Sequence, residues 1–377
     1  MRVGVPKESR EGERRVALIP DVVQSLTGGD IEVAVESGAG ESAGHPDSEY
    51  SDAGASVGSA DDAWGADVVV KVALPTIEEI GRLRSGQVLI GHLAPLTSGE
   101  TTKALADAGV TSFAMEAIPR ITRAQAMDAL SSQANVAGYA ATLLAATEVG
   151  RFFPMMTTAA GTVAPARVLV LGAGVAGLQA IATAKRLGAV VSGFDIRRAA
   201  WEQIASLGGR PLELGVIPDA EAEGGYARPL TDEENEKVRE ALAEAAARQD
   251  VIITTALVPG RKAPLLITAE AVRNMQPGSV IIDLAGESGG NCELSKAGET
   301  VIENGVKIIA PLHLPSEMAT HASQLYAKNV ENLLKLLVSE EGALNIDFDD
   351  EVVAGACLTH EGEIKNERAR EAAGVSG

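Results

Sequence analysis

Short β-branched runs alternate with segments of helix length along most of the chain. One series of runs occupies residues 2–6, 31–36, 67–73, 87–93 and 111–116, and a second series occupies residues 166–172, 189–195, 250–256, 279–285 and 306–311. Such runs are typical of parallel strands that helices cover on both faces. The pattern therefore predicts an α/β fold with two doubly wound, Rossmann-like parallel sheets, one for each series.

Two long helical segments are expected to join these domains. Residues 131–151 contain few helix breakers, and residues 318–340 carry apolar positions at spacings of three and four. The second segment follows the second sheet, so the chain is expected to return to its first domain. We therefore predict an N-terminal domain made of residues 1–136 and 318–377 and a nucleotide-binding domain made of residues 137–317.

Two further segments depart from the β/α alternation. Near the C-terminus, β-like stretches flank the sequence THEG at 359–362, which predicts a hairpin followed by a mobile polar tail. Inside the second domain, residues 218–237 form a long polar segment. It is either a solvated surface loop or a mobile loop that brings Gly225 and Tyr226 onto a bound ligand, and the sequence leaves both interpretations open.

Composition and charge disfavour several classes of partner. The 377 residues carry a net charge of −20, so nucleic acid and anionic membrane surfaces would repel the chain. The sequence has no apolar run of 18 residues and begins without a hydrophobic signal segment, so we expect a cytoplasmic protein that does not insert into the membrane. The two cysteines, Cys292 and Cys357, and the five histidines lie outside metal-ligand spacings, so no metal site is expected.

A glycine-rich motif begins the second domain. Gly172, Gly174 and Gly177 directly follow a predicted strand and precede an Ala-rich helix, and Asp195 ends the next strand. In this context the first glycine makes a tight turn, the second lets the backbone approach a pyrophosphate, and the third lets the helix pack closely on the strand. Free N–H groups at the start of the helix attract phosphate. The motif therefore predicts a dinucleotide site.

The end of the second Rossmann strand indicates which dinucleotide binds. A carboxylate at Asp195 would accept a hydrogen bond from the adenosine ribose and repel a 2′-phosphate, which favours NAD over NADP. The adjoining Arg197 and Arg198 favour NADP instead, since an arginine near this strand end can accommodate a phosphate. We favour NAD because the acid stands at the expected position.

A row of polar residues precedes the glycine motif. Arg120, Gln125, Asp128 and Ser131 follow one another at intervals of five, three and three. If the chain is helical from Thr122 onward, the intervals of three place the last three side chains along one face. The row either contributes to a ligand site or reflects an ion pair between Arg120 and Asp128 at the start of a helix.

Five motifs give the chain a resemblance to a known family. They are VGVPKE at 3–8, PRITRAQAMDALSSQANVAGY at 119–139, AAGTVAPARVLVLGAGVAGLQAIATAKRLGA at 159–189, GGYA at 224–227 and IIDLAGESGGNC at 281–292. Nearly the whole chain resembles the NAD(H)-binding domain, or separate soluble α subunit, of proton-translocating nicotinamide nucleotide transhydrogenase. The resemblance implies an oxidoreductase in which NADH held here passes a hydride, with Si-to-Re specificity, to NADP⁺ on a separate NADP(H)-binding β subunit, while membrane-spanning components move protons.

The resemblance also implies roles for individual residues. Arg120, Gln125, Asp128 and Ser131 would surround the nicotinamide and its ribose at the cleft between the domains. The implied cofactor contacts are Gly172, Gly174, Val175, Gly177, Asp195, Ile196, Arg197, Gly225, Tyr226, Ala256 and Leu257. Transfer between two nicotinamides moves a hydride and no proton, so positioning is needed rather than acid–base catalysis. The family further implies a homodimer, to which residues 152–163 could contribute a hairpin, held at the cytoplasmic face of the membrane by its partner subunits.

Alanine dehydrogenase, which oxidises L-alanine to pyruvate with NAD, is the alternative because it shares this fold and much of this pattern. Arg15, Lys71 and His92 match its substrate-binding and catalytic residues, which bind a carboxylate and move protons. Two features depart from it, since the expected aspartate is Glu287 here and the row at 120–131 replaces a shorter pattern. Lys71 and His92 then serve packing and hydrogen bonding. A nucleotide-binding module without chemistry is a third class that the residues leave open.

We predict that the unmodified protein binds NADH well and NADPH poorly, because the Asp195 carboxylate favours a ribose hydroxyl over a phosphate. Asp195→Ala should narrow the difference between the two dissociation constants. Titrations followed by the fluorescence of each reduced nucleotide measure both constants. Equal affinity of the unmodified protein for NADH and NADPH would show instead that Arg197 and Arg198 dominate the site.

Overall fold

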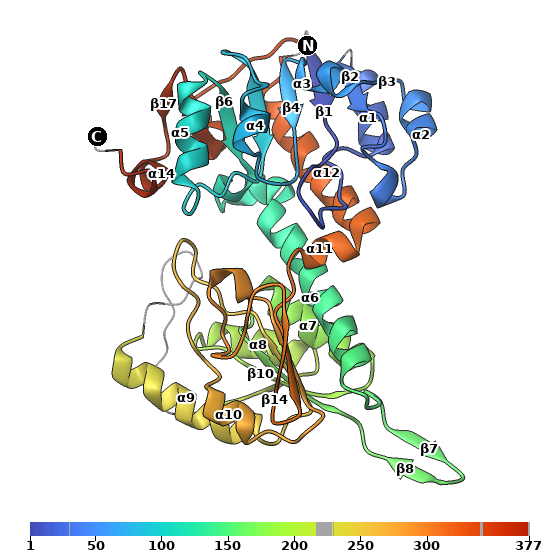
Figure 1. Cartoon of the computed structure of the whole chain (residues 1–377), viewed down its shortest axis with the longest axis vertical. Helices are drawn as coiled ribbons and strands as arrows, with labels where there is room; N and C mark the ends of the chain where they lie inside the picture. The colour runs from blue at the N-terminus through green and yellow to red at the C-terminus, as the bar shows by residue number, and fades with distance from the viewer. Residues whose placement is uncertain (30, 216–227, 229, 340–341, 376–377) are drawn as a thin grey trace. The chain divides into compact units, whose positions relative to one another are not determined.

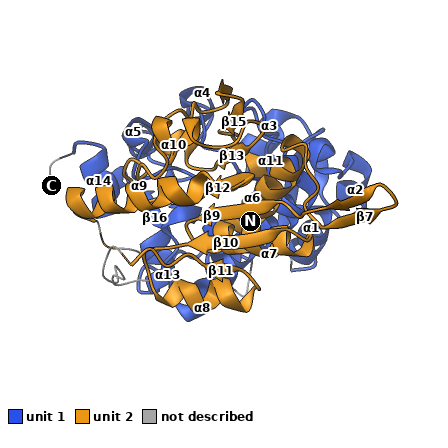
Figure 2. Cartoon of the chain, turned by 90° about the horizontal axis from the view of Figure 1, so that it is seen from below, with its two compact units in different colours: residues 1–133, 315–377 blue, residues 134–314 orange. Residues whose placement is uncertain are grey.

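Both ends of the sequence contribute to one of the two units into which the chain folds (Figures 1 and 2). The computed structural model describes residues 1–29, 31–215, 228, 230–339 and 342–375. Unit 1 consists of residues 1–133 and 315–377, and unit 2 consists of residues 134–314. The chain leaves unit 1 within helix α6 (Ala129–Glu148) and returns within the short helix α11 (Leu314–Glu317). The expected divisions after residues 136 and 317 fall within one helical turn of these boundaries.

Unit 1 is built on an eight-stranded sheet with the order β17-β16-β6-β5-β4-β1-β2-β3 (Figure 1). Its strands are β1 (Arg2–Val5), β2 (Glu32–Glu36), β3 (Ser56–Gly58), β4 (Val68–Val70), β5 (Val88–Gly91), β6 (Thr111–Ala114), β16 (Cys357–His360) and β17 (Glu363–Ile364). Strands β1 to β6 are parallel, whereas β16 runs antiparallel to both β6 and β17. The strand order reverses between β1 and β4, which is where open α/β sheets bind ligands.

Helices pack against this sheet and close its core. They are α1 (Pro20–Thr27), α2 (Asp47–Asp52), α3 (Ala60–Trp64), α4 (Ile77–Ile80), α5 (Gly99–Asp107), α12 (Ala319–Leu336), α13 (Glu351–Ala356) and α14 (Glu367–Ala372), with 3₁₀ turns η1 (Glu41–Ala43), η2 (Met115–Ala117) and η3 (Thr122–Met127). Capping boxes start α3 and α4, where Ser59 and Thr76 accept hydrogen bonds from the backbone three residues on. The buried residues of α12 join the strand side chains in the main apolar cluster of the unit.

Unit 2 is built on a seven-stranded sheet with the order β11-β10-β9-β12-β13-β15-β14, whose central strands follow the same doubly wound order as those of unit 1. Its strands are β9 (Arg167–Leu171), β10 (Val190–Phe194), β11 (Arg210–Pro211), β12 (Val251–Thr254), β13 (Val280–Asp283), β14 (Thr300–Glu303) and β15 (Val306–Ile309). Only β14 pairs antiparallel among these described strands. The strand order reverses between β9 and β12, so the ends of these two strands define the expected ligand position.

The remaining elements of unit 2 are helices and one projecting hairpin. The helices are α7 (Val175–Arg186), α8 (Ala199–Ser206), α9 (Asp232–Ala246) and α10 (Ala269–Arg273), with a 3₁₀ turn η5 (Gly286–Ser288). The hairpin pairs β7 (Met156–Thr158) with β8 (Gly161–Val163), and Figure 1 shows it extending away from the sheet of its unit. All residues of both hairpin strands are exposed.

The predicted α/β fold with two doubly wound, mostly parallel sheets is confirmed, and so is the hairpin around residues 359–362. The return helix expected over residues 318–340 is present as α12, Ala319–Leu336. Two expectations need correction, because β14 and β16 pair antiparallel with their neighbours and the tail contains helix α14. The Asn366 side chain caps α14 by accepting from the Ala369 N–H, which stabilises a helix in a polar segment.

Helix length and hydropathy bear on membrane insertion. Across the described parts of the chain, every helix is too short or too polar to span a bilayer. The longest, α6, has 20 residues. Its midpoint instead packs against protein, because a Cβ atom on Gly138 would lie 2.1 Å from the carbonyl oxygen of Ala176 in α7. This close approach requires glycine and fixes the separation of α6 and α7 within unit 2.

We predict that Gly138→Ala lowers the free energy of unfolding by about 3 kcal/mol, because the added methyl group overlaps the α7 backbone. Helix propensity acts in the opposite direction by about 1 kcal/mol, so a net loss identifies the contact. Urea denaturation measures the effect. Gly29→Ala is the control, since its Cβ would meet only ordinary contacts at 3.4 Å and beyond. Equal stability of the two variants would refute the packing argument.

Candidate functional site

The glycine motif forms a turn that is tight on one side and open on the other. Gly172 adopts a φ of 95°, and a Cβ on Gly177 would lie 1.8 Å from the carbonyl oxygen of Gly172. Gly174 precedes α7, and a Cβ there would meet nothing within 4 Å. The next residue, Val175, is 40% exposed. The turn therefore leaves free backbone at the start of a 12-residue helix, as a bound pyrophosphate requires.

Asp195 lies beside this turn, where the motif places it. Its buried carboxylate accepts from the backbone N–H of Ala173 at 2.8 Å. The Arg197 guanidinium donates to both of its oxygens, from Nε at 2.9 Å and from Nη2 at 2.7 Å. Arg197 therefore pairs with the acid rather than standing as an independent phosphate ligand. The structure thus adds an interaction that the sequence did not indicate, a bidentate ion pair at the end of β10.

The other implied cofactor residues of unit 2 lie at the same edge of its sheet. Ile196 is half-buried after β10, and Ala256 and Leu257 follow β12. The Thr255 hydroxyl donates to the carbonyl oxygen of Gly172 at 3.0 Å, so the β12 end touches the glycine turn. Leu257 is 50% exposed. The structure thus brings these residues to the reversal between β9 and β12.

Gly225 and Tyr226 lie outside the described residues. Their predicted closure over a bound nucleotide stays a prediction. The described chain resumes with Arg228, which forms an ion pair with Glu234 at 2.7 Å. Thr231 starts α9 with a capping box, in which its side chain accepts from the Glu234 N–H. The polar segment after residue 230 is therefore helical rather than loop.

The polar row lies on a 3₁₀ turn and a helix cap. The chain is helical from Thr122 as a 3₁₀ turn, since η3 spans Thr122–Met127, and the α-helix α6 begins only at Ala129. Asp128 lies between them, and its carboxylate accepts from both the N–H of Ser131 at 2.8 Å and its hydroxyl at 2.6 Å. Because a 3₁₀ turn has three residues per turn, the interval of three still aligns Gln125 with Asp128. Gln125 and Arg120 are exposed.

A buried ion pair lies in the segment between β1 and α1 of unit 1. The Arg15 guanidinium donates to both carboxylate oxygens of Glu13, at 2.8 and 2.6 Å, and to Gln133 at 2.8 Å. The Glu13 side chain is only 1% exposed. Burial opposes its charge, but hydrogen bonds from Arg15 and from the Ser316 hydroxyl lower the pKa of Glu13 to about 2. Groups of its own chain therefore hold the Arg15 guanidinium.

Lys71 is held in a second buried cluster, just beyond the carboxyl ends of β1 and β4. Its ammonium lies 3.1 Å from Glu8 and 3.0 Å from Glu79. Burial opposes its charge, yet the two carboxylates raise the pKa of Lys71 above its ordinary value. Burial raises the pKa of Glu8, and the attraction of Lys71 offsets only part of this rise. Loss of the ammonium would leave buried carboxylates unpaired, which commonly costs about 3–5 kcal/mol.

His92 completes the set that matches alanine dehydrogenase. Its Nδ1 lies 3.5 Å from Glu116, whose carboxylate also accepts from the N–H groups of Leu93 and Ala94. The ring stacks at a tilt on Tyr326, whose hydroxyl donates to the Lys71 carbonyl oxygen at 2.7 Å. Glu287 lies in η5 of unit 2 and is exposed. In the described residues no group of three or more His, Cys, Asp or Glu side chains is placed to hold a metal ion.

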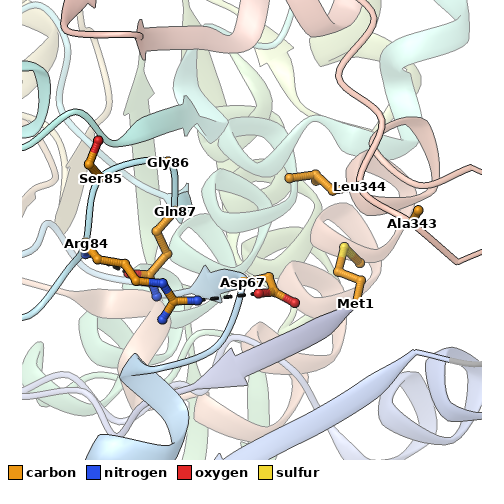
Figure 3. Close-up of a pocket in the computed structure, with 8 residues that line it drawn as sticks. All are labelled: Met1, Asp67, Arg84, Ser85, Gly86, Gln87, Ala343 and Leu344. Atoms are coloured by element: carbon orange, nitrogen blue, oxygen red, sulfur yellow. Dashed lines mark hydrogen bonds and ion pairs between the residues drawn. The ribbon is translucent and has the colours of Figure 1, made fainter.

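A pocket of about 420 Å³ opens at the amino ends of β1, β4 and β5 (Figure 3). Figure 3 shows its lining, which consists of Met1, Asp67, Arg84, Ser85, Gly86, Gln87, Ala343 and Leu344. Its charged groups already pair with each other, since Arg84 lies 3.4 Å from Asp67. It also lies at the end of the sheet opposite to the one where such folds bind ligands. We assign it no role.

The sequence motifs indicate no role for two buried polar residues near the glycine turn. Asp283 ends β13 and Asn291 follows it, and both side chains are fully buried. Asn291 bonds to Ala256, beside the glycine turn. Their only sequence signal is that both lie within the motif at 281–292, which supports the family resemblance but indicates no role for either residue. Their hydrogen bonds connect segments far apart in sequence, so periodicity cannot reveal them.

Comparison with known proteins agrees with this geometry. The chain matches the family model "Alanine dehydrogenase/PNT, N-terminal domain" over residues 4–137 and "Alanine dehydrogenase/PNT, C-terminal domain" over residues 141–367. It is 49% identical over 374 residues to the first part of NAD(P) transhydrogenase subunit alpha of Rhodospirillum rubrum, covering 97% of each chain. It also matches the crystal structure of transhydrogenase from Sinorhizobium meliloti, with a TM-score of 0.85, 46% identity and coverage of 97% of this chain and 98% of that one.

The chain therefore belongs to the alanine dehydrogenase/PNT family, whose members with this fold bind NAD(H). Within the family it groups with the alpha subunits of NAD(P) transhydrogenase, as the motifs indicated. Alanine dehydrogenase is more distant, since the enzyme of Mycobacterium tuberculosis is 33% identical over 391 residues, covering 100% of this chain and 97% of that one.

We predict that Glu13 makes the protein sensitive to acid. Its pKa is about 2 in the folded protein and ordinarily 4.5, so its stabilisation is complete above about pH 5 and is lost as pH falls toward 2. The contribution is on the order of 3 kcal/mol. Glu13→Gln should therefore be less stable than the unmodified protein at pH 7. The gap between their free energies of unfolding should shrink as the pH falls.

Urea denaturation between pH 7 and pH 3 measures this gap. Glu32→Gln is the control, because Glu32 is exposed on β2. Its pH profile should match that of the unmodified protein. A gap between Glu13→Gln and the unmodified protein that does not change with pH would contradict the assignment.

Proposed function

We propose that the chain binds NADH at the glycine turn of unit 2 and exchanges a hydride with NADP⁺ held by a separate NADP(H)-binding subunit. The observation that supports this most is the open backbone at Gly174, which lies beside the Asp195 carboxylate at the reversal of strand order. Gly172, Gly174, Val175 and Gly177 would receive the pyrophosphate, and Asp195, Ile196 and Arg197 the adenosine ribose. Gly225, Tyr226, Ala256 and Leu257 would complete the site.

Reduced NAD, when bound, supplies the hydride. The work of the chain is to position the nicotinamide and to exclude side reactions, with no proton transferred. We assign this positioning to Arg120, Gln125, Asp128 and Ser131. The Asp128 carboxylate holds the Ser131 hydroxyl in one orientation, and the 3₁₀ turn aligns Gln125 with that pair. A fixed geometry of this kind would also set the Si-to-Re specificity of the transfer.

The buried clusters of unit 1 support this function over amino-acid oxidation. Arg15 and Lys71 would have to bind or activate an amino acid, but both cations pair with carboxylates of their own chain. His92 likewise faces Glu116. We therefore propose that these residues maintain the fold in this protein.

Partner subunits follow from the proposed reaction. Since every described helix is too short or too polar to cross a bilayer, we propose that separate membrane-spanning subunits move the protons and hold this chain at the cytoplasmic face. The hairpin β7–β8 supports a homodimer, because apolar side chains on and beside it are exposed, namely Phe152, Met155, Met156 and Val163. Hydride transfer to the NADP(H)-binding subunit, followed with a nicotinamide analogue, tests the proposal directly.

We predict that Gln125→Asn slows hydride transfer to that subunit while weakening NADH binding only modestly. The shorter side chain would misplace the ring, and a displacement of about 1 Å can cost on the order of a hundredfold in rate. Single-turnover transfer measures the rate, and nucleotide fluorescence measures the affinity. His92→Ala should leave the transfer rate nearly unchanged, because no step needs its proton.

Lys71→Ala is a weaker control than His92→Ala, because it removes the partner of two buried carboxylates and destabilises the fold. Alanine-dependent reduction of NAD⁺ is assayed beside the transfer. If His92→Ala abolished turnover while Gln125→Asn had no effect, the alanine dehydrogenase assignment would replace the present one. Loss of all activity with NADH binding intact would favour a binding module.

A further inference from the structure

One side chain joins the two ends of the loop that follows β12. The Oδ1 atom of Asn291 accepts from the N–H of Ala256 at 3.0 Å, and its Nδ2 atom donates to the carbonyl oxygen of the same residue at 2.9 Å. Nδ2 also donates to the carbonyl oxygen of Pro264 at 2.8 Å. The amide thus satisfies the start and the end of the 256–264 loop at once.

The main chain of Asn291 strengthens the same connection. Its carbonyl oxygen accepts from the N–H groups of Leu266 at 2.8 Å and Ile267 at 3.0 Å, just beyond the loop. The residue is fully buried, so water does not compete for these bonds. All hydrogen-bonding atoms of the side chain point at loop backbone. A residue needed only to fill space would not require this complete polar match.

A buried carboxylate holds Asn291 in place. Asp283 accepts from the N–H groups of Asn291 at 2.9 Å and Cys292 at 3.0 Å, and from the Ser295 hydroxyl at 2.6 Å. Its other oxygen accepts from the Thr254 hydroxyl at 2.8 Å and from the Ala285 N–H at 3.0 Å. Five donors therefore satisfy this carboxylate and fix the chain between β13 and Ser295.

The loop that Asn291 clamps touches the glycine turn. The Thr255 hydroxyl donates to the Gly172 carbonyl oxygen at 3.0 Å, and a Cβ on Gly172 would lie 3.1 Å from the Ala256 nitrogen. A shift of Ala256 would therefore disturb the turn as well as the exposed Leu257 beside it. The hydrogen bonds run from Asp283 through Asn291 to the loop that carries two of the proposed cofactor contacts.

We propose that Asn291 is a positioning residue for the dinucleotide, which keeps the 256–264 loop in its binding-competent conformation before the cofactor arrives. The inference rests on the proposed NADH site. Without the clamp the loop samples other conformations, and the apparent dissociation constant rises as the fraction of competent protein falls. Bound NADH restores the conformation, so the transfer rate at saturating NADH changes little.

The test compares Asn291→Ala with Ser279→Ala. Ser279 is also buried, and its hydroxyl donates to the Gln249 carbonyl oxygen at the opposite end of β13. Each variant loses side-chain hydrogen bonds within unit 2, but only Asn291→Ala removes bonds that hold the 256–264 loop. We expect Asn291→Ala to weaken NADH binding about tenfold, to leave the saturated transfer rate within about threefold, and to speed amide hydrogen exchange at Ala256.

Ser279→Ala should keep NADH affinity within about twofold of the unmodified protein despite its loss of stability.

Should Asn291→Ala fail to fold, Asn291→Ser leaves room for a bridging water and is measured instead. If neither variant folds, rapid exchange at Ala256 in the unmodified protein without nucleotide overturns the proposal, and slow exchange there supports it. A folded Asn291 variant with unchanged affinity overturns it while leaving the NADH site standing. An unmodified protein that binds no NADH overturns both.

Discussion

The separation of α7 from β9 is fixed by a contact that only glycine permits. A side chain at Gly177 would overlap the Gly172 carbonyl oxygen, and one at Gly138 would overlap the Ala176 carbonyl oxygen of α7. The helix start is therefore held close to the sheet, where its free N–H groups face the end of β9. Asp195, Thr255 and the loop after β12 are arranged around that fixed point. Without this close approach, the same strands would form a sheet but not the open turn at which we propose that the dinucleotide binds.

The central strands could be predicted from sequence, whereas the edges could not. Runs such as residues 167–171 and 280–283 are β-branched and buried, because neighbours cover them on both sides. The missed strand β11 has two residues, one of them proline, and β3 ends in glycine, so neither carries a strand pattern. β16 joins the first sheet from the far end of the chain, and local pattern carries no information on such pairings.

The residues of the candidate site also divide into those that the sequence predicts and those that it does not. The tight turn at the glycines and the place of Asp195 beside it were predictable, because both depend on backbone geometry next to them in sequence. The bond between Arg197 and Asp195 spans only two residues, yet rotamer choice rather than spacing decides it. Asn291 was missed because its partners Ala256 and Pro264 become neighbours only in the folded unit. The central strands of the two sheets share one order, but the buried ion pairs of Lys71 lie at the reversal in unit 1, and an open glycine turn lies at that of unit 2.

The chain has two tryptophans, and each unit contains one of them. Trp64 lies in unit 1 with Lys71 and Arg82 within 5.6 Å of its ring, while Trp201 in unit 2 donates from its indole nitrogen to the Asp195 carbonyl oxygen at 2.9 Å. Their emission should differ, since one indole lies against two cations and the other is hydrogen-bonded to the chain just after β10. Replacing either one by phenylalanine would leave a single optical probe, so the cooperativity of unfolding between the units becomes directly measurable.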